Sequence, residues 1–297
     1  MARLEGSMVA VVTPMKDGGV DHKSLRDLVE FQLAEGTDGI IPCGTTGEAA
    51  TLTAQERYEV VKTVVEQVRG RAVVIAGAGS NATHEAIAGV KVAKELKADA
   101  ALVVTPYYNK PQPEGLFLHY TAIHEATRFP VVAYNVPGRT SVDMLPDTVA
   151  RLAKSGAIVG IKEATANMDR QVQLVERIGQ GSGFAYLSGD DFTVVPYIAC
   201  GGHGVISVVA NVIPRAMKEL VVAARQGDSA KALGLQVAMA ELNRMMFVET
   251  NPAPVKAAVA LLGKAGPEIR LPLAKVSDAS LAKVREAMVK FGLKLAA

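Results

Sequence analysis

The sequence predicts an α/β fold in which a closed parallel sheet is followed by a small helical domain. Over residues 1–226, short apolar stretches of strand length alternate with polar or glycine-rich turns and amphipathic helical stretches. Strands that alternate with helices form βαβ units, which build parallel sheets through right-handed crossovers. Eight such units match a closed (β/α)8 barrel, or TIM barrel, better than an open sheet. Strand signals then stop, and residues 227–297 contain helical stretches.

The expected strands are short and rich in Val, Ile and Ala, as in a sheet buried on both faces. They are Met8–Thr13, Gly39–Cys43, Ala72–Ala76, Ala100–Val104, Val131–Asn135, Ile158–Lys162, Ala185–Ser188 and Gly204–Val208. Helices expected between them include Ser24–Glu35, Ala54–Arg69, Thr83–Leu96, Gly115–Thr127 and Pro146–Lys154. The C-terminal part contributes Leu233–Met246, Ala253–Leu262 and Ser280–Lys290. The turn Gln226-Gly227-Asp228 is the expected joint between a catalytic barrel (1–226) and a helical domain (227–297).

Composition narrows the classes of function. The chain has 297 residues, of which 49% are hydrophobic, so it can bury a large core. The formal net charge is +2 and the basic residues are scattered, so the sequence predicts no basic patch that would bind nucleic acid or an anionic membrane. The longest apolar runs have the length of a strand, so neither a signal peptide nor a transmembrane helix is expected. Cys43 and Cys200 are the only cysteines, which predicts a reducing cytoplasmic location rather than a disulfide framework.

Lys162 is the most informative side chain, because it follows the apolar run Ile158–Ile161. Desolvation favours the neutral amine, which is the form that attacks carbonyl groups, so a lysine at the end of a buried strand suits a Schiff base. The alternative is a structural lysine paired with Glu163 or another acid at the rim of the barrel. From this segment alone, both interpretations stay open.

Further polar side chains lie at or after the carboxyl ends of other expected strands, where the chemistry of a (β/α)8 barrel is found. These side chains are Thr45, Thr46, Tyr107, Tyr108, Tyr134 and Arg139. Each alone has an ordinary explanation as a turn residue, a packed or surface tyrosine, or an exposed loop arginine. Together they suit an amine nucleophile with hydroxyl proton carriers and a carboxylate clamp.

Competing motifs are weaker. The run Gly77–Ala82 formally matches a dinucleotide fingerprint, but it lies in the third βα unit, and no acid ends the next strand. The run Gly44–Gly47 lacks the Gly-Lys-Ser/Thr sequence of a phosphate loop. The five histidines have no metal-ligand spacing, so we expect neither a catalytic metal nor another cofactor.

Several motifs resemble the pyruvate-dependent class I aldolase superfamily and, within it, the dihydrodipicolinate synthase family. In chain order they are Gly44–Glu48, Tyr134–Thr140, Gly160–Ala164, Leu187–Asp191, Gly201–Ser207 and Phe247–Pro252. The resemblance implies the barrel with a C-terminal helical domain, which the strand pattern predicts separately. It also implies that pyruvate condenses with L-aspartate 4-semialdehyde to give 4-hydroxy-tetrahydrodipicolinate, on the route to diaminopimelate and lysine.

The resemblance also implies roles for individual residues, with Lys162 forming the imine with pyruvate. Tyr134, Thr45 and the Tyr108 of a neighbouring subunit would transfer protons. Thr46, Ile206 and Gly189 would bind pyruvate. Arg139 would bind the carboxylate of the semialdehyde. A homotetramer built from two tight dimers is implied as well. The alternatives are a 2-keto-3-deoxy sugar acid or N-acetylneuraminate lyase and, in another class, a non-catalytic small-molecule sensor. The threonine pair with Arg139 favours the synthase.

A possible site for lysine follows from the same resemblance. Regulated relatives bind lysine at the dimer interface, and the matching positions here are Asn81, Glu85 and Tyr107. The chain departs from the regulated pattern elsewhere, where it has Ala49, Ala54 and Arg57 instead of a serine and histidines. We therefore expect lysine to inhibit weakly or not at all.

Overall fold

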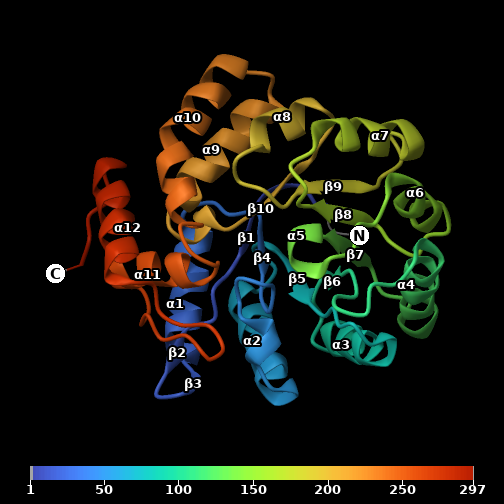
Figure 1. Ribbon diagram of the computed structural model, residues 1–297, viewed down its shortest axis with the longest axis horizontal. Coiled ribbons are helices and arrows are strands. Elements are labelled where there is room, and N and C mark those ends of the chain that lie inside the picture. Colours follow the sequence, from blue (N-terminus) through green and yellow to red (C-terminus); the bar gives the residue numbers. More distant parts are fainter. Residues whose placement is uncertain (1–2, 297) are drawn as a thin grey trace.

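A closed barrel of parallel strands, surrounded by helices, forms the body of the computed structural model, which describes residues 3–296 (Figure 1). Around the barrel the strands follow the order β1-β10-β9-β8-β7-β6-β5-β4, and the pairing of β1 with both β10 and β4 closes it. The barrel strands are β1 (Gly6–Ala10), β4 (Gly39–Ile41), β5 (Val73–Gly77), β6 (Ala100–Val104), β7 (Val131–Asn135), β8 (Gly160–Glu163), β9 (Ala185–Ser188) and β10 (Gly204–Ser207). The predicted (β/α)8 fold class is confirmed.

Helices follow the strands and cover the barrel. They are α1 (His22–Ala34), α2 (Ala54–Val68), α3 (Thr83–Glu95), α4 (Pro113–Thr127), α5 (Pro137–Thr140), α6 (Pro146–Lys154), α7 (Met168–Ile178), α8 (Val194–Ala199) and α9 (Pro214–Arg225). The tail helices α10 (Ser229–Met245), α11 (Ala253–Leu261) and α12 (Asp278–Lys290) group at one side of the barrel (Figure 1). Among residues 3–296, every helix is too short or too polar to cross a membrane. The turn 226–228 lies between α9 and α10, and a domain boundary there stays a prediction.

Short elements complete the fold and include a hairpin that the strand pattern did not predict. They are the strands β2 (Met15–Lys16) and β3 (Gly19–Val20) and the 3-10 turns η1 (Ala49–Thr51) and η2 (Val209–Asn211). The hairpin strands are too short to produce a hydrophobic period, which explains why the sequence gives no signal for them.

Apolar side chains form two packed layers, because alternate residues of a strand point to opposite faces of the sheet. One set fills the barrel interior and includes Met8, Ile41, Ile75, Leu102 and Val132. The other set packs against the helices and includes Val9, Ile40, Val74, Val103 and Ala133. The strand ends therefore stand on a rigid base, and the polar side chains that follow them are held in place.

The first strand ends earlier than the predicted Thr13, at Ala10. The side chain of Asn211 causes this change, since its Nδ2 donates to Ala10 O at 2.9 Å and its Oδ1 accepts from Val12 N at 3.0 Å. A side-chain amide thus replaces the neighbouring strand as the partner of the backbone. Similarly, α10 begins at Ser229 rather than at the predicted Leu233, because the preceding Asp228 caps it.

His119 in α4 makes the stability of the fold sensitive to acid. The imidazole is buried, with its Nδ1 3.0 Å from Thr83 Oγ1, and burial lowers its pKa to about 4. The folded chain keeps the ring neutral, whereas the unfolded chain takes up a proton below the ordinary pKa of about 6.5. This contribution to stability is present above about pH 6.5 and is lost as the pH falls towards 4.

The free energy of unfolding should fall between pH 6.5 and pH 4, and we predict that this fall is about 3 kcal/mol smaller in His119→Gln. The figure follows because one pKa unit corresponds to about 1.4 kcal/mol. Urea titrations at both pH values measure the effect. Thr83→Val is the matched control, because it removes the hydrogen bond but leaves the imidazole buried, so it should lower stability and keep the pH dependence. An unchanged pH dependence in His119→Gln contradicts the prediction.

Candidate active site

Lys162 and Tyr134 lie side by side at the carboxyl ends of two neighbouring strands. In the β7–β8 pair, Tyr134 is directly opposite Lys162. The Lys162 Nζ lies 4.3 Å from the centroid of the Tyr134 ring, and the side chains are 5% and 7% exposed. The amine and the phenol therefore share a largely dehydrated environment.

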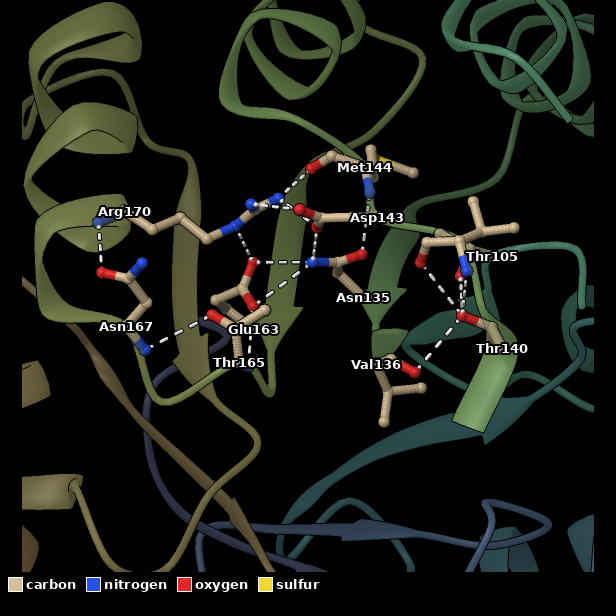
Figure 2. Close-up of polar contacts among 11 residues, drawn as sticks. Thr105, Asn135, Val136, Thr140, Asp143, Met144, Glu163, Thr165, Asn167 and Arg170 are labelled. Carbon is tan, nitrogen blue, oxygen red and sulfur yellow. Dashed lines mark hydrogen bonds and ion pairs between the residues drawn. The ribbon is translucent and has the colours of Figure 1, made fainter. Parts of the chain in front are cut away.

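Glu163 does not neutralise Lys162, although it is the next residue in the chain. Successive strand residues point to opposite faces, so Glu163 faces the helix layer while Lys162 faces the barrel interior. Its Oε2 accepts from Arg170 Nε in α7 at 2.7 Å (Figure 2). The interpretation of Lys162 as the ion-pair partner of Glu163 is therefore wrong, and the interpretation as an amine nucleophile gains support.

Gly189 follows β9 and lies against the Lys162 side chain. A Cβ added at this glycine would lie 3.0 Å from Lys162 Cε and 2.8 Å from Ala164 Cβ. Both distances are shorter than ordinary contacts, so only glycine leaves room for the lysine here. Ile206, another expected site residue, is fully buried in the barrel interior with Tyr134.

The loop after β4 carries Thr45 and Thr46 and is held by the C-terminal tail. Thr46 is 2% exposed, and its Oγ1 accepts from Asn251 Nδ2 at 3.1 Å. Glu48 ends the loop in the left-handed conformation, with φ of 55°, and its buried carboxylate pairs with Lys256 Nζ of α11. Burial lowers the pKa of the Lys256 ammonium, and the Glu48 carboxylate opposes that shift. The tail is thus a structural part of the site.

A cavity of about 370 Å³ opens at this end of the barrel and collects several of the predicted residues. Thr45, Tyr134 and Arg139 line it. Asn251 lines it too, and its carbonyl oxygen accepts from Arg139 Nη2 at 3.1 Å. Lys162 is not part of the lining that the described residues form, but its Nζ lies 4.3 Å from the ring centroid of Tyr134, which does line the cavity. A guanidinium in the lining and an amine next to it suit a small keto acid and a second carboxylate.

The paired tyrosines after β6 have different surroundings. Tyr107 lines the cavity and is 39% exposed, whereas Tyr108 is 88% exposed and has a positive φ of 74°. Among the described residues, the lining of the chain's own cavity does not include Tyr108. This side chain therefore stands apart from the site that its own chain forms.

The residues expected around a lysine ligand are partly brought together. Asn81 Nδ2 donates to Tyr107 O at 3.2 Å, so these two are adjacent. Glu85 lies in the first turn of α3, where it contacts His84 at 3.4 Å. Arg57, one of the departures from the regulated pattern, lines the same cavity as Tyr107.

Cys43 does not provide a nucleophile to the cavity, and the Gly77–Ala82 motif has a structural explanation. Cys43 lines the cavity, but burial raises the pKa of its thiol to about 12, so the nucleophilic thiolate is not formed near neutral pH. Gly77 has a packing explanation, because an added Cβ would lie 1.9 Å from Cys43 O. Within residues 3–296, no three His, Cys, Asp or Glu side chains are grouped so that they could hold a metal ion.

Asn251 and Lys256 are the site residues that the strand pattern did not identify. Both lie beyond the last barrel strand, in the segment expected to form a separate helical part. Lys256 nevertheless carries a signal, because a single charge within the apolar helix α11 requires a buried partner. No comparable signal identifies Asn251 beyond the family resemblance of its segment.

Comparisons with known proteins agree on one family. The model of the Dihydrodipicolinate synthetase family matches residues 3–290. A 4-hydroxy-tetrahydrodipicolinate synthase from Anaeromyxobacter sp. (strain Fw109-5) is 80% identical over 296 residues, which is 100% of each chain. The dihydrodipicolinate synthase from Aquifex aeolicus superposes with a TM-score of 0.96 at 46% identity, covering 98% of this chain and 99% of that one.

A further solved structure has the same fold. It is the chloride-inhibited dihydrodipicolinate synthase from Acinetobacter baumannii complexed with pyruvate, which has a TM-score of 0.95 and 46% identity, with 97% of this chain and 99% of that one covered. Similarity of this extent along nearly the whole chain, together with the paired Lys162 and Tyr134, leads to one conclusion. The chain belongs to the dihydrodipicolinate synthetase family.

Proposed function

We propose that this chain condenses pyruvate with L-aspartate 4-semialdehyde through a Schiff base on Lys162, and that the product is 4-hydroxy-tetrahydrodipicolinate. The observation that carries the proposal is the Lys162 amine, 4.3 Å from the Tyr134 ring and free of the neighbouring Glu163. The names of the matched relatives support the same reaction, and the Acinetobacter relative binds pyruvate. They favour the synthase over a sugar-acid lyase or a sensor.

The reaction begins when the neutral amine of Lys162 attacks the ketone carbon of pyruvate and water leaves, which gives an imine. The imine withdraws electrons, so a methyl proton is lost and an enamine forms. The enamine carbon then attacks the aldehyde carbon of the semialdehyde and forms the new carbon–carbon bond. Finally, the amino group of the second substrate attacks the imine carbon, closes the ring and releases Lys162.

Each step moves a proton, and hydroxyl groups suit this task because each both donates and accepts a hydrogen bond. Tyr134 is the main proton carrier in this proposal, since its ring lies next to the Lys162 amine. Thr45 lines the same cavity and continues the relay. Tyr108 of a neighbouring subunit completes it, which agrees with the 88% exposure of this side chain in the single chain.

The remaining roles concern binding. The backbone around Ile206, the backbone at Gly189 and the hydroxyl of Thr46 hold the pyruvate moiety. The turn after Ile206 is firmly built, because the buried Asp191 carboxylate accepts from the amides of Val208 and Val209 at 3.0 and 2.9 Å. Arg139 binds the carboxylate of the semialdehyde, for which a planar guanidinium provides paired donors.

Borohydride reduction in the presence of pyruvate tests the proposal directly. We expect a mass increase at Lys162 that corresponds to a reduced pyruvate adduct. A coupled assay with both substrates should then give turnover with aspartate semialdehyde and none with N-acetylneuraminate. No adduct, or turnover of the sugar acid alone, excludes the proposed reaction.

The proposed assembly is a homotetramer built from two tight dimers in the cytoplasm. The exposed Tyr108 and half-exposed Tyr107 support an interface beside the cavity, since large aromatic side chains are enriched at interfaces. The free cysteines Cys43 and Cys200 agree with a reducing compartment.

The first prediction of this mechanism concerns Lys162. Lys162→Ala removes the amine and Lys162→Arg replaces it with a permanently protonated guanidinium, so each variant should lose roughly a thousandfold or more in turnover. The coupled assay measures this loss, and circular dichroism checks that the barrel is folded. Lys154→Ala, at an exposed lysine of α6, is the control and should keep full activity. Substantial turnover in either Lys162 variant rules out the Schiff base.

The second prediction concerns the sharing of Tyr108 between subunits. Tyr108→Phe chains and Lys162→Ala chains should each be impaired alone. In a mixed dimer, one site combines an intact Lys162 with the partner's intact Tyr108, so mixing should restore activity. Activity is measured after subunit exchange shown by native mass spectrometry. If exchange occurs without recovery, Tyr108 does not act across the interface.

The third prediction concerns inhibition by lysine. Each mismatched hydrogen bond to a charged ligand costs about 1–3 kcal/mol, so the departures at Ala54 and Arg57 should weaken binding about tenfold or more. We expect no clear inhibition midpoint below about 1 mM lysine in the coupled assay. The double variant Ala54→His with Arg57→His should bind lysine more tightly. A submillimolar midpoint for the unmodified chain contradicts the prediction.

A further inference from the structure

Two buried side chains, Asn135 and Arg170, close the base of the loop that carries Arg139 (Figure 2). The loop leaves β7 after Asn135, forms α5 and returns at Asp143 and Met144. Asn135 Oδ1 accepts from Met144 N at 3.0 Å, and Asn135 Nδ2 donates to Asp143 Oδ1 at 3.0 Å. The side chain at the start of the loop therefore holds the two residues at its end.

Asn135 is itself fixed by a buried ion pair. Its Nδ2 lies 3.3 and 3.2 Å from the two carboxylate oxygens of Glu163, and Glu163 Oε2 accepts from Arg170 Nε at 2.7 Å. Arg170 also donates to Asp143 Oδ2 at 3.1 Å and to the carbonyl oxygen of Met144. Asn135, Glu163 and Arg170 are 0%, 2% and 7% exposed, so water does not compete for these hydrogen bonds.

A second set of hydrogen bonds, made by Thr140, holds the loop next to Arg139. The hydroxyl of Thr140 lies 3.2 Å from Val136 O, 3.0 Å from Val142 O and 3.3 Å from Thr105 Oγ1. The backbone on both sides of Arg139 is therefore fixed, and its guanidinium is left to reach the cavity and Asn251 O. The loop is thus held at its base by Asn135 and beside Arg139 by Thr140.

We propose that Asn135 is a positioning residue for the second substrate, because it holds the Arg139 loop in the one geometry that presents the guanidinium to a carboxylate. The inference rests on the proposed function, in which Arg139 binds the semialdehyde carboxylate. Tyr134 packs in the barrel interior, the backbone pairing holds it opposite Lys162, and Gly189 lies against the Lys162 side chain, so these contacts do not involve the Asn135 amide. Loss of the amide therefore affects the second substrate more than the formation of the pyruvate imine.

The first experiment compares the two half-reactions in Asn135→Leu, which keeps the approximate size of the side chain and removes the amide. We expect the KM for L-aspartate 4-semialdehyde to rise about tenfold or more, because a displaced Arg139 guanidinium loses its paired hydrogen bonds to the substrate carboxylate. The rate of borohydride trapping with pyruvate should stay within about threefold of the unmodified chain. An unchanged KM, or a parallel loss of trapping, overturns the proposal.

A double-mutant cycle tests whether Asn135 acts through Arg139. Arg139→Ala alone should raise the KM for the semialdehyde. Adding Asn135→Leu to Arg139→Ala should then raise it by less than about threefold, because the group that Asn135 positions is already absent. A general structural role predicts instead that the two separate effects multiply, and that result overturns the proposal.

Asp143→Ala keeps the test decisive if Asn135→Leu does not fold, since Asp143 is a half-exposed member of the same cluster. Asp143→Ala should also raise the KM for the semialdehyde, and adding it to Arg139→Ala should raise that KM little further. If the two effects multiply instead, the proposal is overturned. Asp147→Ala is the matched control, because this 82% exposed carboxylate pairs with Arg177 and should leave the KM unchanged. Absence of pyruvate trapping in the unmodified chain would defeat the proposed function itself, which separates the two failures.

Discussion

The pairing of β7 with β8 determines the geometry on which the rest of the site depends. Tyr134 lies opposite Lys162, and Asn135 lies opposite Glu163. Because side chains alternate along a strand, the first pair faces the barrel interior and the second faces the helices. A slip of β8 by one residue would turn Lys162 towards the helices and bring Ile161 or Glu163 to the interior face beside Tyr134.

The ion pair of Glu163 with Arg170 on the outward face keeps this register by means that contribute more to specificity than to stability. Burying Glu163 removes a carboxylate from water, and that cost is offset only because both oxygens have donors, from Arg170 Nε and Thr165 N. Removing one partner of such a pair typically costs about 3–5 kcal/mol, since the other charge is left buried and unpaired. The arrangement therefore strongly disfavours any alternative alignment of the two strands.

Much of the architecture was predictable because it depends on local patterns. Alternating apolar and amphipathic segments predict the barrel, and a lysine directly after an apolar strand identifies Lys162. The same local view left the partner of Lys162 open, because sequence proximity to Glu163 says nothing about which face each side chain occupies until the strand is built.

The contacts that sequence patterns missed join distant parts of the chain. Asn251 reaches Thr46 across 205 positions, and Asn211 ends β1 across 201. Neither produces a periodic signal, since a side-chain amide that satisfies remote backbone or hydroxyl groups depends on the completed fold. The family resemblance included the Asn251 segment but gave no role for the residue itself.

The buried pair of Glu48 and Lys256 has a consequence for how the protein is made. These residues are 208 positions apart, so during synthesis the whole barrel sequence leaves the ribosome before Lys256 does. Until then, Glu48 lacks its Lys256 partner, and the loop with the two threonines lacks its contacts with the tail. A nascent or truncated chain without the tail therefore lacks the contacts that hold the threonine loop and Arg139, and the site is complete only once the tail has docked.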